Sequence, residues 1–295
     1  MSKKAFLFPG QGSQFVGMAN DLFDNSVEAK EMIQTADDAL GINLSYIMFH
    51  GPEERLKRTE FTQPAIFLHS VVLTGIIGHS LGEYSALVAA GAIQFFDAVK
   101  IVSQRGKAMQ QAGIDNPGTM AAIIGLSPEI VEKCCNEASD IGIVQSANFN
   151  SPNQIVISGS VMGVKKTMEI CKSKGAKLVK ELVVSGAFHS PLMQPAKDKL
   201  KEVLDNSYIF DARFPVYANV SALPVIKKDE IKKLLCEQVT SPVKWDATVR
   251  NMINDGYTEF YEIGPGNVLQ GLVKRINPDV KCFGISKYSD AEKYL

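Results

Sequence analysis

Gly78-His79-Ser80-Leu81-Gly82 is the stretch that says most about the fold of this 295-residue chain. Gly-x-Ser-x-Gly is the signature of a nucleophile elbow, a sharp strand-to-helix turn that raises the serine oxygen above a sheet. The β-branched pair Ile76-Ile77 precedes it, and a run of helix formers, residues 83–90, follows it and ends at Gly91. We therefore predict an α/β fold with Ser80 as a nucleophile; the alternative is a purely structural turn.

Composition indicates an ordinary globular protein. The chain is 45% hydrophobic and 21% charged, with a net charge of -1, so no global charge attracts it to nucleic acid or an anionic membrane. The five cysteines form no CxxC pair and no metal-ligand spacing, which is typical of reduced thiols. Pro9 follows too early for a signal peptide's apolar region. We expect a cytoplasmic protein without a metal or cofactor and without nucleic-acid or membrane partners.

Strand and helix patterns alternate along the chain. A short buried strand over residues 5–9 leads into the loop Gly10-Gln11-Gly12-Ser13-Gln14, the kind of position where ligands gather in parallel sheets. The strand at 258–262 leads in the same way into Gly264-Pro265-Gly266. The remaining expected elements of this part are helices at 26–40, 64–73 and 97–112 and a strand at 215–219.

A second, smaller unit is expected in the middle of the chain. Asp115-Asn116-Pro117-Gly118 is a strong break and marks its beginning. Its pattern is that of a ferredoxin-like βαββαβ insert, although the middle strands are less definite around 142–149. The expected elements are strands at 119–125, 154–159 and 177–184 and helices at 128–138 and 161–174. We predict a large α/β domain formed by 1–115 and 187–295, with an α/β-hydrolase-like core and a parallel sheet, and a small domain formed by 116–186.

An elbow serine needs a base, and His189 is the best candidate. It lies in Gly186-Ala187-Phe188-His189-Ser190, a loop between a strand end and a helix start, where functional residues concentrate. It also follows the serine in the chain, the order usual for elbow enzymes. The other three histidines suit the role less well, because His79 is next to Ser80, His50 precedes a turn and His69 lies on a predicted helix. A surface histidine remains the alternative.

Arg105 projects from the apolar face of its predicted helix. On a helical wheel, Ala98, Ile101, Val102, Ala108, Met109 and Ala112 surround it, while Lys100, Ser103, Gln104, Lys107 and Gln111 take the opposite side. An arginine keeps its charge and is costly to bury unpaired, so it must meet a carboxylate. Two partners are possible: an internal Asp or Glu, or a substrate carboxylate held by the planar guanidinium.

Together these residues resemble the malonyl-CoA:acyl carrier protein transacylase family of type II fatty acid synthesis, over almost the whole chain. Any one motif is weak, but their order over this length is highly specific. The resemblance is carried by Phe8-Pro9-Gly10-Gln11-Gly12-Ser13-Gln14, Gln63-Pro64-Ala65, Gly78-His79-Ser80-Leu81-Gly82-Glu83-Tyr84-Ser85-Ala86, Gln104-Arg105-Gly106, Asn148-Phe149-Asn150-Ser151-Pro152, Gly186-Ala187-Phe188-His189-Ser190, Ser241-Pro242-Val243-Lys244-Trp245 and Glu262-Ile263-Gly264-Pro265-Gly266.

The resemblance implies a ping-pong transfer of malonyl from coenzyme A to the thiol of acyl carrier protein. Ser80 would be the nucleophile and His189 the base, oriented by the backbone carbonyl of Gln238. Backbone N–H groups of Gln11 and Leu81 would form the oxyanion hole. Four residues would bind substrate: Arg105 through the malonyl carboxylate, Phe188 by favouring malonyl over α-methylated groups, and Asn148 and Asn150 in the cleft wall. For the asparagines, a structural Asn-Ser-Pro turn is the alternative.

The chain departs from the family before the elbow. The stretch after Gln63-Pro64-Ala65 is about a dozen residues shorter than usual, where a parallel crossover needs room to reverse. Either the helix is truncated and the elbow strand is cut to a stub, or the natural chain has a segment between Thr74 and Gly75 that this sequence lacks. We favour the second.

Other function classes remain in view. A trans-acting polyketide synthase acyltransferase is an alternative close to the family named above. A serine carboxylesterase or thioesterase would need a carboxylate as third triad member, for which Asp115 and Asp140 lie between serine and histidine. A non-catalytic carrier-protein-binding module would tolerate loss of Ser80. We expect malonyl-CoA and acyl carrier protein as partners, a monomer, and a basic docking surface at Lys172, Lys174, Lys177 and Lys180 or at Lys274 and Arg275.

Overall fold

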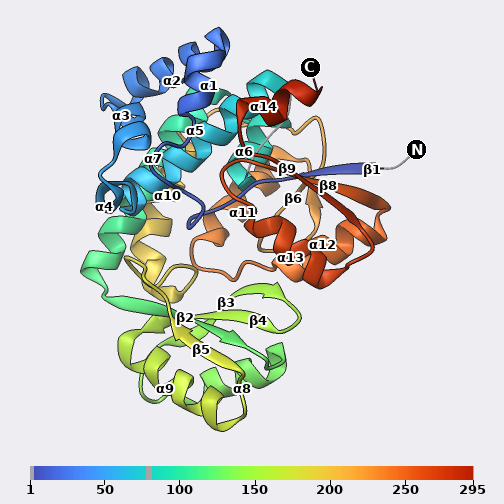
Figure 1. Ribbon diagram of the computed structural model, residues 1–295. Coiled ribbons are helices and arrows are strands. Elements are labelled where there is room, and N and C mark those ends of the chain that lie inside the picture. The colour runs from blue at the N-terminus through green and yellow to red at the C-terminus, as the bar shows by residue number, and fades with distance from the viewer. Residues whose placement is uncertain (1–2, 78–81, 295) are drawn as a thin grey trace.

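The structure, a computed structural model, describes residues 3–77 and 82–294. Figure 1 shows a large part built of helices around a small parallel sheet, and below it a smaller unit with its own sheet. The chain enters the smaller unit after helix α7 (Phe95–Asp115) and leaves it after strand β5 (Leu178–Glu181). The smaller unit is therefore one continuous insert, and the large part is formed by the two segments that flank it.

The large part contains most of the helices. Its elements are β1 (Lys3–Leu7), α1 (Asn20–Asn25), α2 (Val27–Leu40), α3 (Leu44–His50), α4 (Glu53–Leu56), α5 (Thr59–Ile77), α6 (Gly82–Ala89), α7, α10 (Gln194–Asp205), β6 (Val216–Tyr217), β7 (Pro224–Val225), α11 (Lys228–Gln238), α12 (Trp245–Asn254), β8 (Tyr257–Ile263), α13 (Val268–Ile276), β9 (Lys281–Ile285) and α14 (Tyr288–Ala291), with short 3-10 turns at Pro191–Met193 and Glu292–Tyr294.

The main sheet of the described residues is parallel, with the order β1-β8-β9. Ala5 pairs with Phe260, and Phe260 pairs with Cys282, so β8 is the middle strand. Its last four residues are buried, as expected for a parallel strand covered on both faces. The loops after β1 and β8 therefore leave the sheet at the same edge, which confirms the expected parallel α/β arrangement.

A helical layer forms the largest core. Its fully buried side chains include Ile33 of α2, Leu68 of α5, Ile101 of α7, Leu200 of α10 and Leu235 of α11. Helices α5 and α7 approach closely at Gly106, where a Cβ would lie 2.9 Å from the carbonyl oxygen of Thr59. This contact explains why glycine follows Arg105 in the sequence. It also holds the Arg105 turn firmly against α5.

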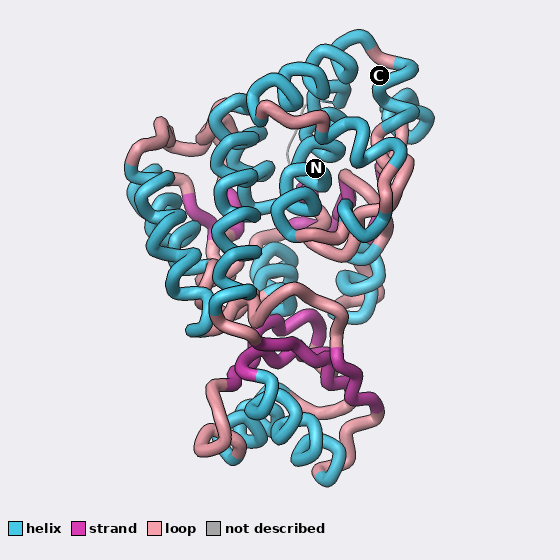
Figure 2. Tube along the Cα trace, turned by 90° about the vertical axis from the view of Figure 1, so that its left-hand side faces the viewer, coloured by secondary structure: helices cyan, strands magenta, loops and turns pink. Residues whose placement is uncertain are grey.

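The smaller unit has the strand order β5-β2-β4-β3 and all-antiparallel pairing, the ferredoxin-like arrangement of a βαββαβ unit. Figure 2 shows its sheet between the large part and the unit's own two helices. A separate apolar core fills the space between this sheet and those helices. Its elements are β2 (Gly118–Ile124), α8 (Pro128–Glu137), β3 (Val144–Ser151), β4 (Gln154–Ser160), α9 (Val161–Ser173) and β5.

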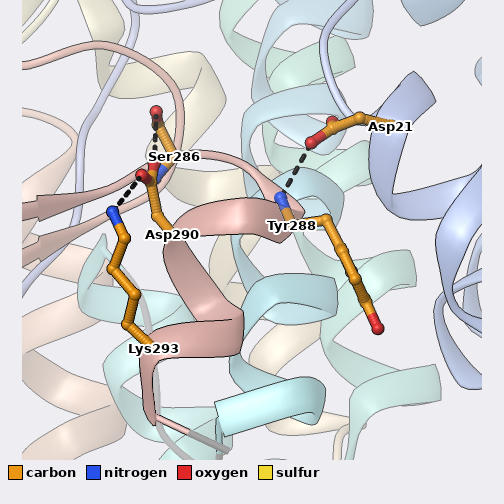
Figure 3. A network of polar contacts seen from close by, with 5 residues as sticks. All are labelled: Asp21, Ser286, Tyr288, Asp290 and Lys293. Atoms are coloured by element: carbon orange, nitrogen blue, oxygen red, sulfur yellow. Dashed lines mark hydrogen bonds and ion pairs between the residues drawn. The ribbon is translucent and has the colours of Figure 1, made fainter.

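The C-terminal turn is tied to two distant helices by polar contacts, of which Figure 3 shows the one with Asp21. The backbone N–H of Tyr288 donates to Asp21 Oδ2 at 2.8 Å, and that of Ser286 donates to Asp290 Oδ2 at 3.2 Å. On the other side, His69 Nε2 donates to the carbonyl oxygen of Ser286 at 2.9 Å. Because a carbonyl only accepts, the proton of His69 is on Nε2. Within 3–77 and 82–294, no helix has the length and apolar character needed to span a membrane.

Three expectations about the large part were wrong. Ile76 and Ile77 form the end of helix α5 and no strand. A strand after the helix would need a loop in which the chain reverses direction, and the helix continues to this pair without one. Pro215–Asn219 contributes a two-residue strand to an antiparallel pair with β7, outside the parallel sheet. Ser103 is buried, since α10 also packs on α7 and covers that side of the helix. Strand β9 was not anticipated.

Candidate active site

One large cavity gathers all seven expected site residues that the structure describes. It has a volume of about 1290 Å³ and lies against the loop after β1, helices α5, α6, α7 and α11, and strand β3. Its wall includes Gln11, Arg105, Asn148, Asn150, Phe188, His189 and Gln238. Ser80 and Leu81 lie outside the described residues, so the nucleophile and one oxyanion donor stay predictions.

His189 is held by the backbone of α11's last residue. Its Nδ1 lies 2.8 Å from the carbonyl oxygen of Gln238, the contact that the family resemblance implies. The carbonyl accepts, so Nδ1 carries the proton and Nε2 keeps its lone pair. Burial, and then the nearby Arg105 cation, lower the pKa of His189 from 6.5 to about 4. The imidazole is therefore neutral at pH 7 and able to take a proton through Nε2.

Arg105 meets amides where a carboxylate was expected. Nη1 donates to Gln63 Oε1 at 2.6 Å, and Nη2 donates to Gln238 Oε1 at 2.8 Å. The guanidinium also lies over the Tyr84 ring, 5.6 Å from its centre. Among the described side chains, no Asp or Glu lies within salt-bridge distance of it, and its Nε is buried without a partner. An internal ion pair of Arg105 with Asp or Glu, one of the two expected alternatives, is therefore not formed among the described residues. The guanidinium can accept an anionic ligand.

Gln238 connects this cation to a carboxylate. Its Nε2 donates to Glu83 Oε2 at 2.6 Å, while its Oε1 accepts from Arg105. Glu83 Oε2 also accepts from the backbone N–H of Asn219 at 3.0 Å. Burial raises the pKa of Glu83, and the hydrogen bonds and the Arg105 charge oppose that rise. The buried side chain of Gln238 is therefore oriented by both neighbours, and its own carbonyl orients His189.

The remaining expected residues occupy the cavity wall. Gln11 is exposed in the turn after β1, where Ser13 N–H donates to the Gly10 carbonyl at 3.3 Å. Phe188 is buried directly before His189. Asn148 and Asn150 lie on β3, and Phe149 between them donates its N–H to the Val243 carbonyl at 2.9 Å. The asparagine run is therefore strand, and the turn follows only after Ser151.

Sequence reasoning missed three polar residues of this network. Gln63, Glu83 and Asn219 had no assigned role, although Gln63 and Glu83 lie in two of the motifs that carry the resemblance. The sequence signal for Glu83 was weak, because an acidic residue in the first turn of a helix is common for its favourable interaction with the helix dipole alone. No group of three or more His, Cys, Asp or Glu side chains in the described chain could hold a metal ion.

The two candidate third triad members are not at the base. Asp115 is at the end of α7 and accepts from Gln111 at 2.7 Å, one turn back on the same helix. Asp140 is exposed in the turn after α8. Since the Gln238 carbonyl occupies Nδ1 of His189, the arrangement differs from a Ser-His-Asp triad.

Comparison with known proteins agrees with this geometry. Residues 5–280 match the acyl transferase domain family. The malonyl CoA-acyl carrier protein transacylase of Bacillus subtilis (strain 168) is 47% identical over 298 residues, 97% of this chain and 94% of the relative. The transacylase of Coxiella burnetii superposes with a TM-score of 0.95 at 38% identity, covering 99% of this chain and 96% of that chain.

A malonyl-transacylase solved in complex with a type II polyketide synthase acyl carrier protein also matches. It has a TM-score of 0.95 and 39% identity and covers 100% of this chain and 99% of that chain. The similarity thus extends over both the large part and the insert. It is seen in the sequences as well as in the folds. The chain belongs to the acyl transferase family that includes the malonyl CoA-acyl carrier protein transacylases.

Proposed function

We propose that this protein transfers a malonyl group from coenzyme A to the phosphopantetheine thiol of acyl carrier protein. The observation that carries the proposal is the Arg105 guanidinium, held by two neutral amides in the same cavity as a neutral His189. Its positive charge suits the free carboxylate of a malonyl group, and its planar donors suit bidentate binding.

The first half-reaction forms an acyl-enzyme. Ser80 Oγ attacks the thioester carbonyl while its proton passes to His189 Nε2. The backbone N–H groups of Gln11 and Leu81 stabilise the oxyanion. When the carbon–sulfur bond breaks, His189 returns the proton to the coenzyme A thiolate. The resulting imidazole is again neutral, which its lowered pKa favours.

The second half-reaction repeats these steps with another thiol. His189 takes the proton of the phosphopantetheine thiol, the thiolate attacks the malonyl ester, and Ser80 leaves with the proton. Arg105 holds the distal carboxylate throughout, while Phe188, Asn148 and Asn150 shape the wall around the acyl group. The mechanism uses no metal or cofactor, because the coenzyme A thioester is the substrate.

Lys274 and Arg275 support a docking site for the carrier protein at the cavity mouth. Both are exposed at the end of α13 and belong to the cavity wall. Lys174, in the other candidate group, pairs with Glu137 at 3.3 Å and so offers less free charge. An acidic carrier would be attracted to the first group, next to the path its thiol must take.

Labelling tests the proposal. Incubation with radiolabelled malonyl-CoA should leave label on the denatured wild-type chain and none on Ser80→Ala. Equal label on both proteins, or none on wild type, would overturn the mechanism. Arg105→Ala should lose malonyl transfer and gain relative preference for the uncharged acetyl group. Loss of both activities in a folded variant would make Arg105 structural.

The carrier protein is the second question, because a relative of high similarity is bound to a polyketide synthase carrier. Transfer rates to a fatty acid synthesis carrier and to a polyketide carrier should be compared at equal concentration. A higher kcat/KM for the first supports a role in fatty acid synthesis. A higher value for the second supports the polyketide alternative.

A further inference from the structure

Gln145 of the small unit bonds to the backbone of the proposed base. It lies on β3, half-buried, and its Nε2 donates to the carbonyl oxygen of His189 at 2.7 Å. The same nitrogen lies 3.3 Å from the carbonyl oxygen of Thr240. Both partners only accept, so the nitrogen must face them and the orientation of the amide is unambiguous.

The backbone of His189 needs such support. Its φ is 57°, in the left-handed region, which a residue with a Cβ rarely adopts. A conformation of this kind persists only where the surroundings determine it. Within the same loop, Ser190 Oγ donates to the Ala187 carbonyl at 2.6 Å and so helps to fix the backbone around His189. Gln145 holds the His189 carbonyl itself, whose direction follows from this conformation.

The second contact reaches the segment that orients the imidazole. Thr240 lies two residues after Gln238, whose carbonyl accepts from His189 Nδ1. One amide group therefore ties together the two backbone segments whose separation sets the 2.8 Å contact. Gln145 Nε2 carries two N–H groups, enough to donate to both carbonyls.

We infer that Gln145 is a positioning residue for the base: it holds His189 in its left-handed conformation and at the Gln238 carbonyl, so that Nε2 faces the reacting atoms. The small unit then contributes to catalysis through this side chain, besides lining the cavity. The inference rests on the proposed role of His189 as the base.

Two variants separate the hydrogen bond from packing. Gln145→Glu keeps the shape and removes the donors, and Gln145→Leu removes all polarity. The matched control is Thr119→Val, which deletes a different hydrogen bond of the same sheet, from Thr119 Oγ1 to Glu181 Oε1 at 3.0 Å. All three retain the full chain and the elbow sequence.

The first readout is the ¹⁵N spectrum of the histidine rings at pH 7, with the His189 signals assigned by their loss in His189→Gln. Wild type and Thr119→Val should show protonated Nδ1 and unprotonated Nε2. Both Gln145 variants should show a mixture of tautomers. A wild-type pattern in both Gln145 variants would overturn the inference, because a merely structural residue would not be expected to set the tautomer.

The second readout is malonyl transfer. Losing the hydrogen bond to the His189 carbonyl should lower kcat by about 3- to 10-fold with KM nearly unchanged. A kcat equal to that of Thr119→Val would contradict the positioning role. If wild type transfers no malonyl but the tautomers still change, the proposed function fails while the placement of His189 by Gln145 stands.

Discussion

The side chain of Gln238 lies between Arg105 and Glu83, accepting from the arginine at 2.8 Å and donating to the carboxylate at 2.6 Å. This amide separates the guanidinium from the Glu83 carboxyl group, so the Arg105 charge is not paired with an acidic side chain among the described residues. The carbonyl of the same residue accepts from His189. The proposed anion site and the proposed base are thus built on one residue.

Replacing Gln238 by glutamate should block the anion site. The new carboxylate would pair with Arg105 internally and repel Glu83, while the backbone carbonyl that orients His189 would remain. We expect KM for malonyl-CoA to rise by about 10- to 100-fold. The kcat for acetyl-CoA, which has no free carboxylate, should change less. Steady-state kinetics with both thioesters measure this. Equal losses for both would show that the substitution damages the base instead.

Gly106→Ala should destabilise the large part. The added Cβ would lie 2.9 Å from the Thr59 carbonyl oxygen and 3.2 Å from Glu60 Cα, which are backbone atoms that cannot move aside cheaply. We expect the free energy of unfolding in urea to fall by about 1–3 kcal/mol. Gly271→Ala, on α13 with nothing within 4 Å of its Cβ, is the control and should raise stability by up to about 1 kcal/mol. Similar values for both would contradict the close approach of α5 and α7.

Acid should destabilise the protein partly through His69. Burial lowers its pKa from 6.5 to about 4, against the opposing effects of the Ser286 carbonyl and Asp21. Between these two pH values the unfolded chain binds a proton that the folded protein does not, so stability falls as the pH drops below 6.5. Going from pH 7 to pH 5, wild type should lose about 2 kcal/mol more than His69→Gln.

Urea unfolding of both proteins at the two pH values measures this difference. His189, whose pKa is also lowered, contributes to both proteins and cancels in the comparison. An equal loss in wild type and variant would show that the folded protein accommodates a charged His69.

Charge reversal at the cavity mouth should weaken use of the carrier protein. The double variant Lys274→Glu/Arg275→Glu should raise KM for acyl carrier protein by about 10-fold at low salt, and less at high salt because exposed charges are screened. The control, Lys172→Glu/Lys174→Glu at the end of α9, should behave like wild type. The reverse pattern would move the docking site to the small unit.

The intact mass of the protein from its natural source should exceed 32.2 kDa, the mass of this 295-residue sequence. The Bacillus subtilis relative aligns over 298 residues, more than this whole chain has, although the alignment covers 97% of the chain. Peptide mapping should place the additional residues between Thr74 and Gly75. A mass of 32.2 kDa would show that the natural chain has no additional residues and that the continuous helix α5 is native.

Much of the fold could be predicted from local pattern. The six apolar neighbours of Arg105 on the helical wheel are all buried, and the elements of the small unit lie within a few residues of their expected bounds. Periodicity works there because each element buries one face. It failed at Ile76-Ile77, where an apolar β-branched pair suits either a strand or the end of a buried helix.

By itself, the sequence determined the parallel α/β class, the βαββαβ insert, and Arg105 on a buried helical face with His189 in a loop. Tertiary structure decided what surrounds them. Gln63 and Gln238 reach Arg105 from positions 42 and 133 residues away, and Gln145 reaches His189 across 44. A glutamine side chain has no periodic pattern and many possible partners, so these contacts follow only from how the helices and the small unit pack together.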